Sequence, residues 1–424
     1  MTILIVHQFY LLAGEPGGSR FNELAKQWAS AGHRVTVVAG NRNYATGRVP
    51  DELRSQWAVE TRDGAVTVWR CHVPASYNAG FLGRVWAFAG FTISSLYASI
   101  RAENPDVIIT TSPPLTVAIT GWALRRFRFP KAKWVFEVRD LWPESAVTTG
   151  VLSGKSLLTR LLYRLEAAAY RNCDLISVLT PAFKADIVRR QLADDNKIAT
   201  IPNAADFRLF EARHDRHALR ESLGWSEKFV LLYAGAHGTA NAITQLVDAA
   251  ERLKHRKDIL IASVGDGPKR RACEESAGAR GLTNIVFLGP VAKDRVHELI
   301  VAADVGVAVL QNNATFKTVY PNKIFDYMAC SRATLLAIDG AARDLVCQQA
   351  QAGVFATPEN PADLAVKIRW MADNRDECLA MGKRGHDWAK VNASRDSIGA
   401  SYLTVLSNLT KCSTQRDSSA VSTC

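Results

Sequence analysis

Hydrophobic residues along the chain gather in short runs rich in Val, Ile and Leu, separated by longer segments with helical spacing. The first run, TILIV, is followed by a glycine-rich turn at 14–18, by FNELAKQWASAG with the spacing of an amphipathic helix, and by the run RVTVVAG. Continuous apolar runs of this length are typical of strands covered by helices on both sheet faces. The pattern predicts a βαβ unit whose first turn lies at the carboxyl end of a strand, where doubly wound sheets bind ligands.

The same alternation continues in two series. The first contains the expected strands DVIITT, KWVFEV, DLISVLT and KIATIP, with helices after Pro114, over 157–171 and from Pro181. After a polar stretch at 203–225, the second contains the strands KFVLLYAG, DILIASVG, NIVFLG, DVGVAVL, TLLAI and GVFAT, with helices over 240–254, 296–303 and 322–330. The sequence therefore predicts an α/β protein of two Rossmann-like, doubly wound domains facing a cleft.

The chain of 424 residues is longer than the size at which a single hydrophobic core stops growing, which also favours two domains. We expect a first domain over 1–205 and a second over 206–393. A helix over 394–411 and a flexible polar tail over 412–424 complete the expected organisation.

The positive charge is concentrated in the first half of the chain. The formal net charge is +11, and residues 1–205 carry 24 Lys and Arg against 16 Asp and Glu. This excess suggests an anionic partner, although solvated surface charge is an alternative. Five basic residues lie within 125–133, but no nucleic-acid-binding motif accompanies them, so a membrane surface is favoured over nucleic acid. The apolar segment 85–100 is too short to span a bilayer and is either a buried helix or a helix lying in the membrane interface.

Glycine follows three of the expected strands. The pairs are Gly17 with Gly18, Gly235 with Gly238, and Gly265 with Gly267. Glycine lets backbone N–H groups approach an anion closely, so each turn is a candidate phosphate site, with an ordinary strand-to-helix turn as the alternative. The dinucleotide-binding and P-loop motifs are absent from the sequence, which argues against an NAD oxidoreductase and a P-loop NTPase. No Asp-x-Asp pair and no cysteine or histidine cluster predicts a metal site.

The stretch YPNKIFDYMA at 320–329 carries the clearest candidate chemistry. Pro321 and Asn322 are expected to open a helix at the carboxyl edge of the second sheet. Its amino terminus and Lys323 would face an anion, while Asp326, one turn further on, would accept hydrogen bonds from a ribose. The alternative is a helix whose polar residues are merely exposed.

A second charged stretch follows the expected strand KWVFEV. Here Arg139, Asp140 and Glu144 come directly after buried positions, at the edge where reaction-centre contacts are expected. A surface salt bridge is the alternative reading of this stretch.

With these stretches together, the chain resembles glycosyltransferase family 4, of the GT-B fold, over nearly its whole length. The resemblance is to bacterial enzymes that build O-antigen, capsule or exopolysaccharide, including the fucosamine-transferase-like branch. Its motifs stand in the family's order: HQFY with GGSR, GHRVTVVAG, EVRDLWPES, ISVLTP, IPNAAD, YAGAHGTAN, VGDGPKR, VFLGPV and YPNKIFDYMA.

The resemblance implies a retaining, metal-independent transfer of a hexosyl or N-acetylhexosaminyl unit from a nucleotide sugar, with UDP favoured and no further cofactor. It implies a donor site in the second domain, an acceptor site in the first, and a last helix that crosses back to the first domain. The implied donor-site residues are Gly235, His237, Gly265, Asp266, Gly267, Pro321, Asn322, Lys323 and Asp326. The implied acceptor-side residues are Gly17, Gly18, Arg20, Arg139 and Glu144. Asp140 is placed beside the reaction centre, and Asp140 and Lys323 are the expected catalytic residues.

The chain departs from the family pattern at two places. The family's pair of glutamates with seven residues between them is replaced by Thr318 and Asp326, and its Arg and Lys-Gly pair by His237 and Asn241. Stabilisation of the diphosphate should therefore rest more on Lys323 and on helix amino termini.

The expected acceptor is a glycan linked to polyprenyl diphosphate, and the expected location is the cytoplasm, at the inner face of the cell membrane. Two other functions stay open from the sequence. One is a sugar-nucleotide epimerase of the same fold, and the other is a non-catalytic basic protein of the membrane surface.

Overall fold

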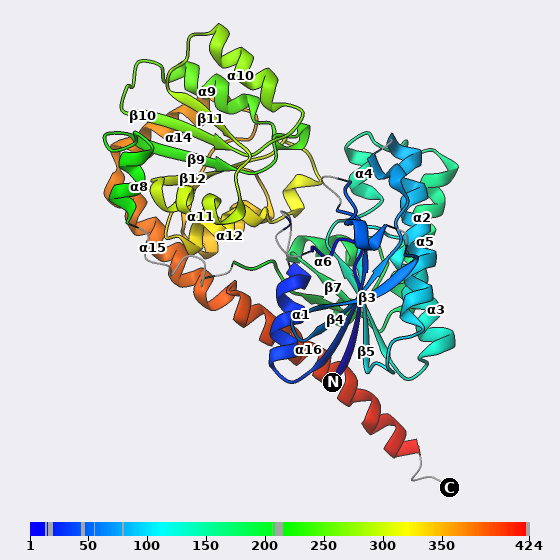
Figure 1. Cartoon of the computed structure of the whole chain (residues 1–424). Coiled ribbons are helices and arrows are strands. Elements are labelled where there is room, and N and C mark those ends of the chain that lie inside the picture. Colours follow the sequence, from blue (N-terminus) through cyan, green and yellow to red (C-terminus); the bar gives the residue numbers. More distant parts are fainter. Residues whose placement is uncertain are drawn as a thin grey trace. The chain divides into compact units, whose positions relative to one another are not determined.

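The computed structural model describes residues 1–12, 15, 20–43, 47–54, 56–78, 80–205, 207 and 215–420. The chain divides into two compact units, a first unit made of residues 1–202 with the chain from Ile398 onward, and a second unit made of Asn203–Ser397. Each unit is built around one sheet (Figure 1). The prediction of two doubly wound α/β units is confirmed.

The sheet of the first unit has the strand order β3-β4-β2-β1-β5-β6-β7-β8, and all neighbours are parallel except β3 and β4. Apart from that antiparallel edge, the order is that of a doubly wound sheet that reverses direction between β1 and β5. The strands are β1 Thr2–Val6, β2 Arg34–Gly40, β3 Ala58–Asp63, β4 Val66–Cys71, β5 Val107–Ser112, β6 Lys133–Val138, β7 Leu175–Val178 and β8 Ile198–Thr200.

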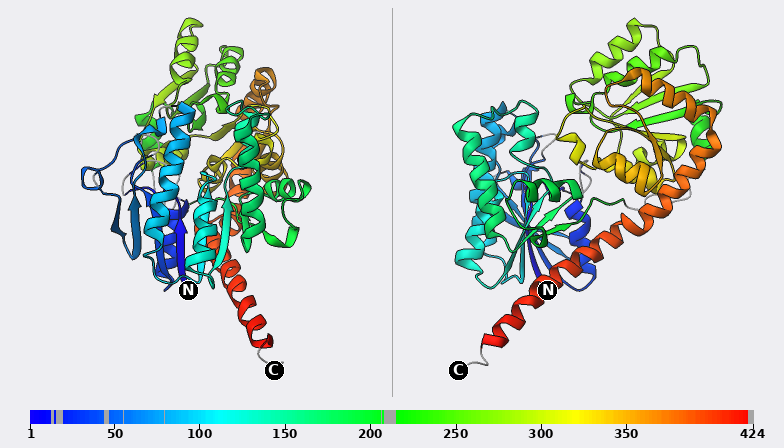
Figure 2. Two further views of the ribbon diagram at one scale, coloured as in Figure 1. Left: turned by 90° about the vertical axis from the view of Figure 1, so that its right-hand side faces the viewer. Right: turned by 180° about the vertical axis from the view of Figure 1, so that it is seen from behind.

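Helices cover both faces of this sheet. Figures 1 and 2 show α2, α3 and α5 on one face, and α1 with the last helix, α16, on the other. The helical elements are α1 Arg20–Ser30, η1 Asp51–Leu53, η2 Ala75–Asn78, α2 Gly80–Ser99, α3 Val117–Ala123, η3 Leu124–Arg128, α4 Glu144–Thr148, α5 Leu157–Asn172, α6 Pro181–Arg189 and η4 Asp195–Lys197. Local sequence fixes several of their starts. For example, the Ser156 hydroxyl accepts the backbone N–H of Thr159 at the start of α5.

The antiparallel pair β3 and β4 was missing from the sequence prediction. Gly64-Ala65 joins the two strands, and Gly64 has a φ of 63°, which a short hairpin turn requires. Neither strand is a continuous apolar run, because β3 (AVETRD) is mostly polar and β4 (VTVWRC) mixes polar and apolar residues, as expected near a half-exposed sheet edge.

The second unit has the strand order β11-β10-β9-β12-β13-β14, with every neighbouring pair parallel. This is the order of a Rossmann sheet, and its direction reverses between β9 and β12. The strands are β9 Phe229–Ala234, β10 Ile259–Val264, β11 Ile285–Gly289, β12 Val305–Val309, β13 Ala333–Ala337 and β14 Gly353–Phe355.

One face of this second sheet packs on α9, α10 and α14, and the other on α8, α11 and α12. The expected helix over 240–254 is divided, because Ala242 has a φ of 43° between η5 and α9. The helical elements are α8 Arg216–Ser222, η5 Thr239–Asn241, α9 Thr244–Arg252, α10 Arg270–Ala279, α11 Lys293–Ala302, η6 Phe316–Thr318, α12 Asn322–Ala329, α13 Ala341–Arg343, η7 Asp344–Gln349, α14 Pro361–Asp373 and α15 Arg375–Asn392.

The last helix, α16, spans Arg395–Ala420 and therefore continues beyond residue 411, where the sequence suggested an end. From Ile398 onward it belongs to the first unit, where the backbone carbonyl of Gly399 accepts the indole N–H of Trp28. Of the helices that the structure describes, none is both long and apolar enough to cross a lipid bilayer.

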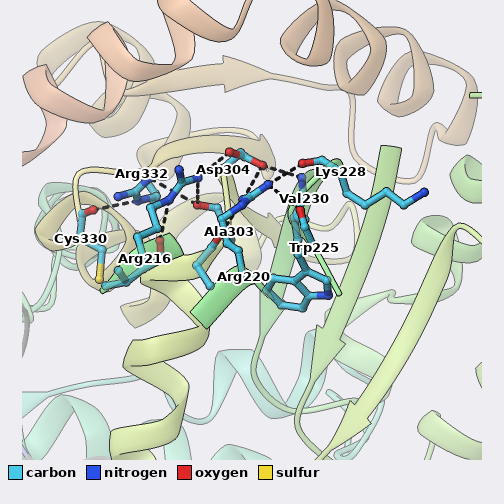
Figure 3. Close-up of polar contacts among 11 residues, drawn as sticks. Arg216, Arg220, Trp225, Lys228, Val230, Ala303, Asp304, Cys330 and Arg332 are labelled. Carbon is cyan, nitrogen blue, oxygen red and sulfur yellow. Dashed lines mark hydrogen bonds and ion pairs between the residues drawn. The ribbon is translucent and has the colours of Figure 1, made fainter. Parts of the chain in front are cut away.

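An arginine cluster fastens the amino ends of the second sheet (Figure 3). Asp304, directly before β12, accepts the backbone N–H of Val230 at 2.8 Å and pairs with Arg216 at 2.6 Å and Arg220 at 3.1 Å. Arg332 donates to the carbonyl of Cys330, and its burial lowers its pKa to about 10. Because this cluster lies at the amino edge of the sheet and is satisfied internally, it holds α8 to the sheet and is no part of the candidate site.

Candidate active site

The candidate donor site of the second unit lies at the carboxyl ends of β9, β10 and β12, at the point where strand order reverses. Gly235 follows β9 with a φ of 147°, and Gly265 and Gly267 follow β10 with φ of 131° and 154°. Side chains other than glycine rarely adopt such angles. The structure thus brings two of the three predicted glycine turns to one sheet edge.

The two glycine turns contact each other directly. A Cβ on Gly265 would lie 1.9 Å from the carbonyl oxygen of Gly235, and one on Gly267 would lie 2.7 Å from the backbone of His237. Hydrogen bonds join the turns, from the His237 N–H to the Asp266 carbonyl at 2.8 Å and from the Lys269 N–H to the His237 carbonyl at 2.9 Å. The glycines are therefore needed for the packing of one turn on the other, which shapes the edge where an anion would bind.

His237 is fully buried within this wall. Its Nε2 lies 2.7 Å from the Ser263 hydroxyl, and its ring meets the rings of Tyr233 and Phe287. Burial lowers the pKa of His237, and the nearby cations Lys323 and Arg270 lower it further. The imidazole is therefore neutral near pH 7, and a role beside a diphosphate would be that of a hydrogen-bonding group rather than a cation.

Lys323 lies at the start of α12 and reaches back over the end of β9. Its Nζ is buried, lies 3.8 Å from the centroid of the Tyr233 ring and would lie 2.9 Å from a Cβ on Gly235. None of the described residues gives this nitrogen a hydrogen-bond partner. Burial lowers the pKa of Lys323 to about 7. A buried amine with unused donors beside a glycine turn is suited to receive an anionic ligand.

The other predicted residues of this site surround Lys323 or cap the neighbouring turns. Pro321 precedes α12, and the Asn322 side chain accepts the Asn203 side-chain amide at 2.6 Å. Asp326 lies one turn further along the same helix and is half-buried. Asp266 accepts the backbone N–H of Gly267 at 2.8 Å, so it stabilises the second glycine turn.

The two departures from the family motif also lie near this edge. The Thr318 hydroxyl donates to the Thr315 carbonyl at 2.7 Å, and Asn241 belongs to the short helix η5 that follows the first glycine turn. Neither side chain brings a positive charge, which leaves Lys323 as the buried cation among the residues described at the end of β9.

In the first unit, the loop after β6 carries the predicted reaction-centre residues. The Asp140 carboxylate accepts the Ser145 hydroxyl at 2.9 Å, and the Glu144 carboxylate accepts the Tyr163 hydroxyl at 2.5 Å. Burial raises the pKa of Asp140, while the Ser145 hydrogen bond opposes that rise. Arg139 is joined to the end of β5 by its backbone N–H. The loop is thus a fixed carboxylate-bearing edge, and its contact with an acceptor stays a prediction.

Arg20 is engaged within the first unit. Its guanidinium pairs with Glu137 at 3.2 Å and donates to the backbone carbonyls of Ile201 and Pro202. These contacts are structural, so an acceptor contact by Arg20 also stays a prediction. Gly17 and Gly18, predicted beside it, lie outside the described residues.

Two buried polar residues near the carboxyl ends of this sheet belong to stretches quoted from the sequence but were not assigned to the site. Glu137 is fully buried inside β6, and the signal for it was an acidic residue within an otherwise apolar strand. His7 follows β1 and is buried, and burial together with the charges of Arg139 and Arg70 lowers its pKa. The signal for His7 was a histidine directly after the first apolar run.

Comparisons with known proteins show which proteins the chain is similar to. The family model of the glycosyl transferase 4-like domain matches residues 17–204, and that of the glycosyl transferases group 1 matches residues 228–374. The chain is 27% identical to the candidate colanic acid biosynthesis glycosyl transferase WcaI of Escherichia coli strain K12, over 74% of this chain and 77% of WcaI. It is 25% identical to the candidate glycosyltransferase WbjE of Pseudomonas aeruginosa, over 67% and 70% of the two chains.

Among solved structures, Alr3699/HepE of Anabaena in complex with UDP-glucose has a similar fold, with a TM-score of 0.70, 18% identity, and coverage of 96% of this chain and 100% of that chain. The two parallel-sheet units and the likeness to this structure show a GT-B fold, and the two family models identify a glycosyltransferase. The chain belongs to glycosyltransferase family 4 and is a bacterial enzyme of polysaccharide biosynthesis, since the two family models together cover most of its length.

Proposed function

We propose that this glycosyltransferase moves a hexosyl or N-acetylhexosaminyl unit from a UDP-sugar, with retention of configuration and without metal or other cofactor, to a glycan linked to polyprenyl diphosphate. The observation that carries the donor half of the proposal is the buried Lys323 amine, which has no hydrogen-bond partner among the described residues and faces Gly235. The UDP and UDP-glucose bound by Anabaena HepE support uridine as the base. Family membership supports the retention of configuration.

The chemistry required of the donor site is stabilisation of a leaving diphosphate. Negative charge grows on the diphosphate as its bond to the sugar breaks, and a fixed cation in a buried position stabilises that charge more than it stabilises the ground state. Protonated Lys323 supplies the cation, and the amino terminus of α12 supplies backbone N–H groups of the same sign. Metal independence is consistent with this arrangement, because the lysine would stabilise the charge that a metal ion stabilises in metal-dependent enzymes.

Binding of UDP tests the donor half. A thermal-shift panel with UDP, GDP, ADP and CMP, each with and without Mg²⁺, should show stabilisation by UDP that Mg²⁺ does not change. Lys323→Ala should abolish the UDP shift. Lys317→Ala is the matched control, because Lys317 is exposed in nearby η6 and pairs with Asp339. A UDP shift that requires Mg²⁺ would contradict metal independence. The absence of a shift with any nucleotide would contradict the proposed donor site.

Measuring UDP release during turnover then distinguishes sugar transfer from isomerisation of the UDP-sugar. We expect UDP release from a UDP-sugar to depend on Lys323 and to rise when membrane extract containing lipid-linked glycans is added. An epimerase of the same fold would instead convert the UDP-sugar to its epimer without releasing UDP.

The acceptor half of the proposal places the enzyme at the cytoplasmic face of the cell membrane. Figure 2 shows the helices that cover one face of the first sheet. We use the name outer apolar face for the exposed hydrophobic side chains of α2, α3, η3 and α5. These are Trp86, Ile93, Tyr97, Ile119, Trp122, Phe127, Leu157 and Leu161. Apolar side chains gathered in this way are typical of an interaction surface.

Basic residues accompany the outer apolar face. Arg84 and Arg101 lie at the two ends of α2, and Arg125, Arg126 and Arg128 lie in η3. Apolar and cationic side chains on the same helices complement an anionic lipid surface, which attracts the cations and receives the aromatic rings. A lipid-linked acceptor would be reached from such a surface, and O-antigen or exopolysaccharide synthesis would supply it.

A further inference from the structure

The first unit contains an apolar cavity that neither the proposed donor site nor the outer apolar face uses. Its volume is about 190 Å³. Ten of its lining residues are apolar, and they come from the segment after β1, from α2, from the segment after β5, from the loop after β6, from the segment between α4 and α5, and from α5. The lining residues are Phe9, Arg84, Val85, Phe88, Pro113, Pro114, Leu115, Thr116, Trp142, Val151, Leu158 and Leu162.

The cavity has room for hydrocarbon. An apolar cavity of roughly 150 Å³ in another protein stays dry and takes up benzene, so the volume here fits a short branched piece of hydrocarbon chain. Arg84 is the charged residue of the lining and is exposed on α2, so the cavity has a positive charge in its lining. An apolar cavity with an exposed cation in its lining is complementary to a lipid that has a phosphate at the head of its chain.

The position of the cavity connects it with the predicted reaction centre. Trp142 lines the cavity, and its backbone N–H donates to the Asp140 carbonyl at 2.8 Å. On α5, Leu158 and Leu162 line the cavity, while Tyr163 on the same helix holds the Glu144 carboxylate. The loop that carries the acceptor-side carboxylates therefore also forms a wall of the cavity.

The cavity is bordered by the outer apolar face. Val85, which lines the cavity, is followed on α2 by exposed Trp86, and Leu158 and Leu162 on α5 are each preceded by an exposed leucine. A chain leaving a bilayer at this face would meet the cavity after crossing little water-exposed surface.

We propose that this cavity binds the first isoprene units of the acceptor's polyprenyl anchor, with the adjoining phosphates near Arg84. The inference rests on the proposed lipid-linked acceptor and adds a specific subsite to it. It commits to a branched isoprenoid chain, because the lining is built of rings and branched side chains and the proposed acceptor carries a polyprenyl anchor.

Farnesyl diphosphate is a suitable soluble probe, and its binding can be measured by calorimetry. We expect farnesyl diphosphate to bind the wild-type protein at least tenfold more tightly than inorganic diphosphate, and at least tenfold more tightly than dodecyl phosphate, which has a straight chain. Equal binding of dodecyl phosphate would overturn the proposal in favour of a membrane acyl chain, and equal binding of inorganic diphosphate would show that the cavity contributes nothing.

Variants that fill the cavity identify the site. Leu162→Trp adds bulk inside the cavity and should weaken farnesyl diphosphate binding at least tenfold. Leu379→Trp is the matched control, because Leu379 is a leucine on α15 that is 61% exposed and does not line the cavity, and it should bind as the wild type does. Val85→Trp, on α2, provides a second filling variant in case Leu162→Trp unfolds. Equal binding by the filling and control variants would overturn the proposal.

The thermal shift with UDP distinguishes a failure of the cavity assignment from a failure of the proposed function. Farnesyl diphosphate binding without a UDP shift would contradict the proposed function and leave the cavity assignment in place. A UDP shift in every variant, with farnesyl diphosphate binding that ignores the filling substitutions, would contradict only the cavity assignment.

Discussion

The amine of Lys323 lies 3.8 Å from the centre of the Tyr233 ring, buried and without a hydrogen-bond partner among the described residues. The ring face offers a partly negative surface, but this contact does not replace the hydration that the ammonium loses. Burial accordingly lowers the pKa of Lys323 to about 7. The lysine is held in a position that is unfavourable for its charge until an anion arrives.

Replacing Lys323 should stabilise the ligand-free protein near neutral pH. The unfolded chain holds this proton up to about pH 10.5, whereas the folded chain loses it near pH 7. The free energy of unfolding should therefore rise with pH between these values, and below pH 7 the full penalty of the buried charge is present. Since one pKa unit corresponds to about 1.4 kcal/mol, we expect Lys323→Met to add at least about 2 kcal/mol at pH 7 and progressively less toward pH 10.

Denaturant unfolding at several pH values measures this effect. Lys317→Met, an exposed lysine in η6, serves as the control and should follow the wild type. Parallel stability curves for Lys323→Met and the wild type would show that the amine is not desolvated.

Binding of UDP should be coupled to proton uptake. At pH 8 the Lys323 amine is mostly neutral in the ligand-free protein, and a diphosphate beside it would raise its pKa and restore the proton. Calorimetry in two buffers with different ionisation enthalpies should give an uptake approaching one proton per UDP at pH 8. The uptake should fall to near zero at pH 6 and in Lys323→Met if that variant still binds UDP. Uptake that is equal in the wild type and the variant would assign the proton to another group.

A methyl group at Gly265 should disrupt the donor site. A Cβ there would lie 1.9 Å from the Gly235 carbonyl oxygen, and the φ of 131° is itself unfavourable for alanine. We expect Gly265→Ala to abolish the UDP thermal shift and to lower stability by about 2 kcal/mol or more, because the clash and the strain add. Gly278→Ala, in α10 with open space around it, is the control and should be neutral or slightly stabilising.

The outer apolar face should determine membrane binding. Trp86 is 65% exposed and Phe127 is 70% exposed, and both accompany arginines. The double variant Trp86→Ser, Phe127→Ser should bind vesicles containing anionic lipid at least tenfold more weakly in flotation, while Leu379→Ser, an equally exposed apolar position on α15, should bind as the wild type does. Equal flotation of wild type on neutral and anionic vesicles would argue against the role of the arginines.

The sequence predicted the donor-side elements because their signals are local. Continuous apolar runs gave the parallel strands, and the order of motifs placed Lys323 at the start of a helix that follows β12. What it did not predict depends on residues far apart in the chain. The amine of Lys323 is desolvated by β9, and the glycines at 235 and 265 are needed because their turns touch, neither of which a linear pattern contains.

On the acceptor side, contacts between residues far apart in the chain also escaped prediction from the sequence. Arg20 was expected to face a ligand because of its motif, but its guanidinium is occupied by Glu137, a residue 117 positions away. The Glu137 side chain is fully buried and that of Arg20 is 7% exposed. No local pattern around either residue indicates that Arg20 and Glu137 form a pair.

The free energy of unfolding of Arg20 variants distinguishes a structural role of Arg20 from a role in acceptor binding. Arg20→Met would leave the Glu137 carboxylate buried without its cation, which typically costs about 3–5 kcal/mol. Glu137→Gln would leave the arginine without its anion and should also destabilise strongly, because the carbonyls of Ile201 and Pro202 satisfy only part of the guanidinium. The double variant Arg20→Met, Glu137→Gln should recover a large part of the loss, since neither charge then remains unpaired. Denaturant unfolding measures all three, and Arg54→Met is the control because the Arg54 ion pair with Asp51 is exposed. Unchanged stability in Arg20→Met, together with a loss of transfer activity, would mean that the contact with Glu137 contributes little and that Arg20 acts on the acceptor.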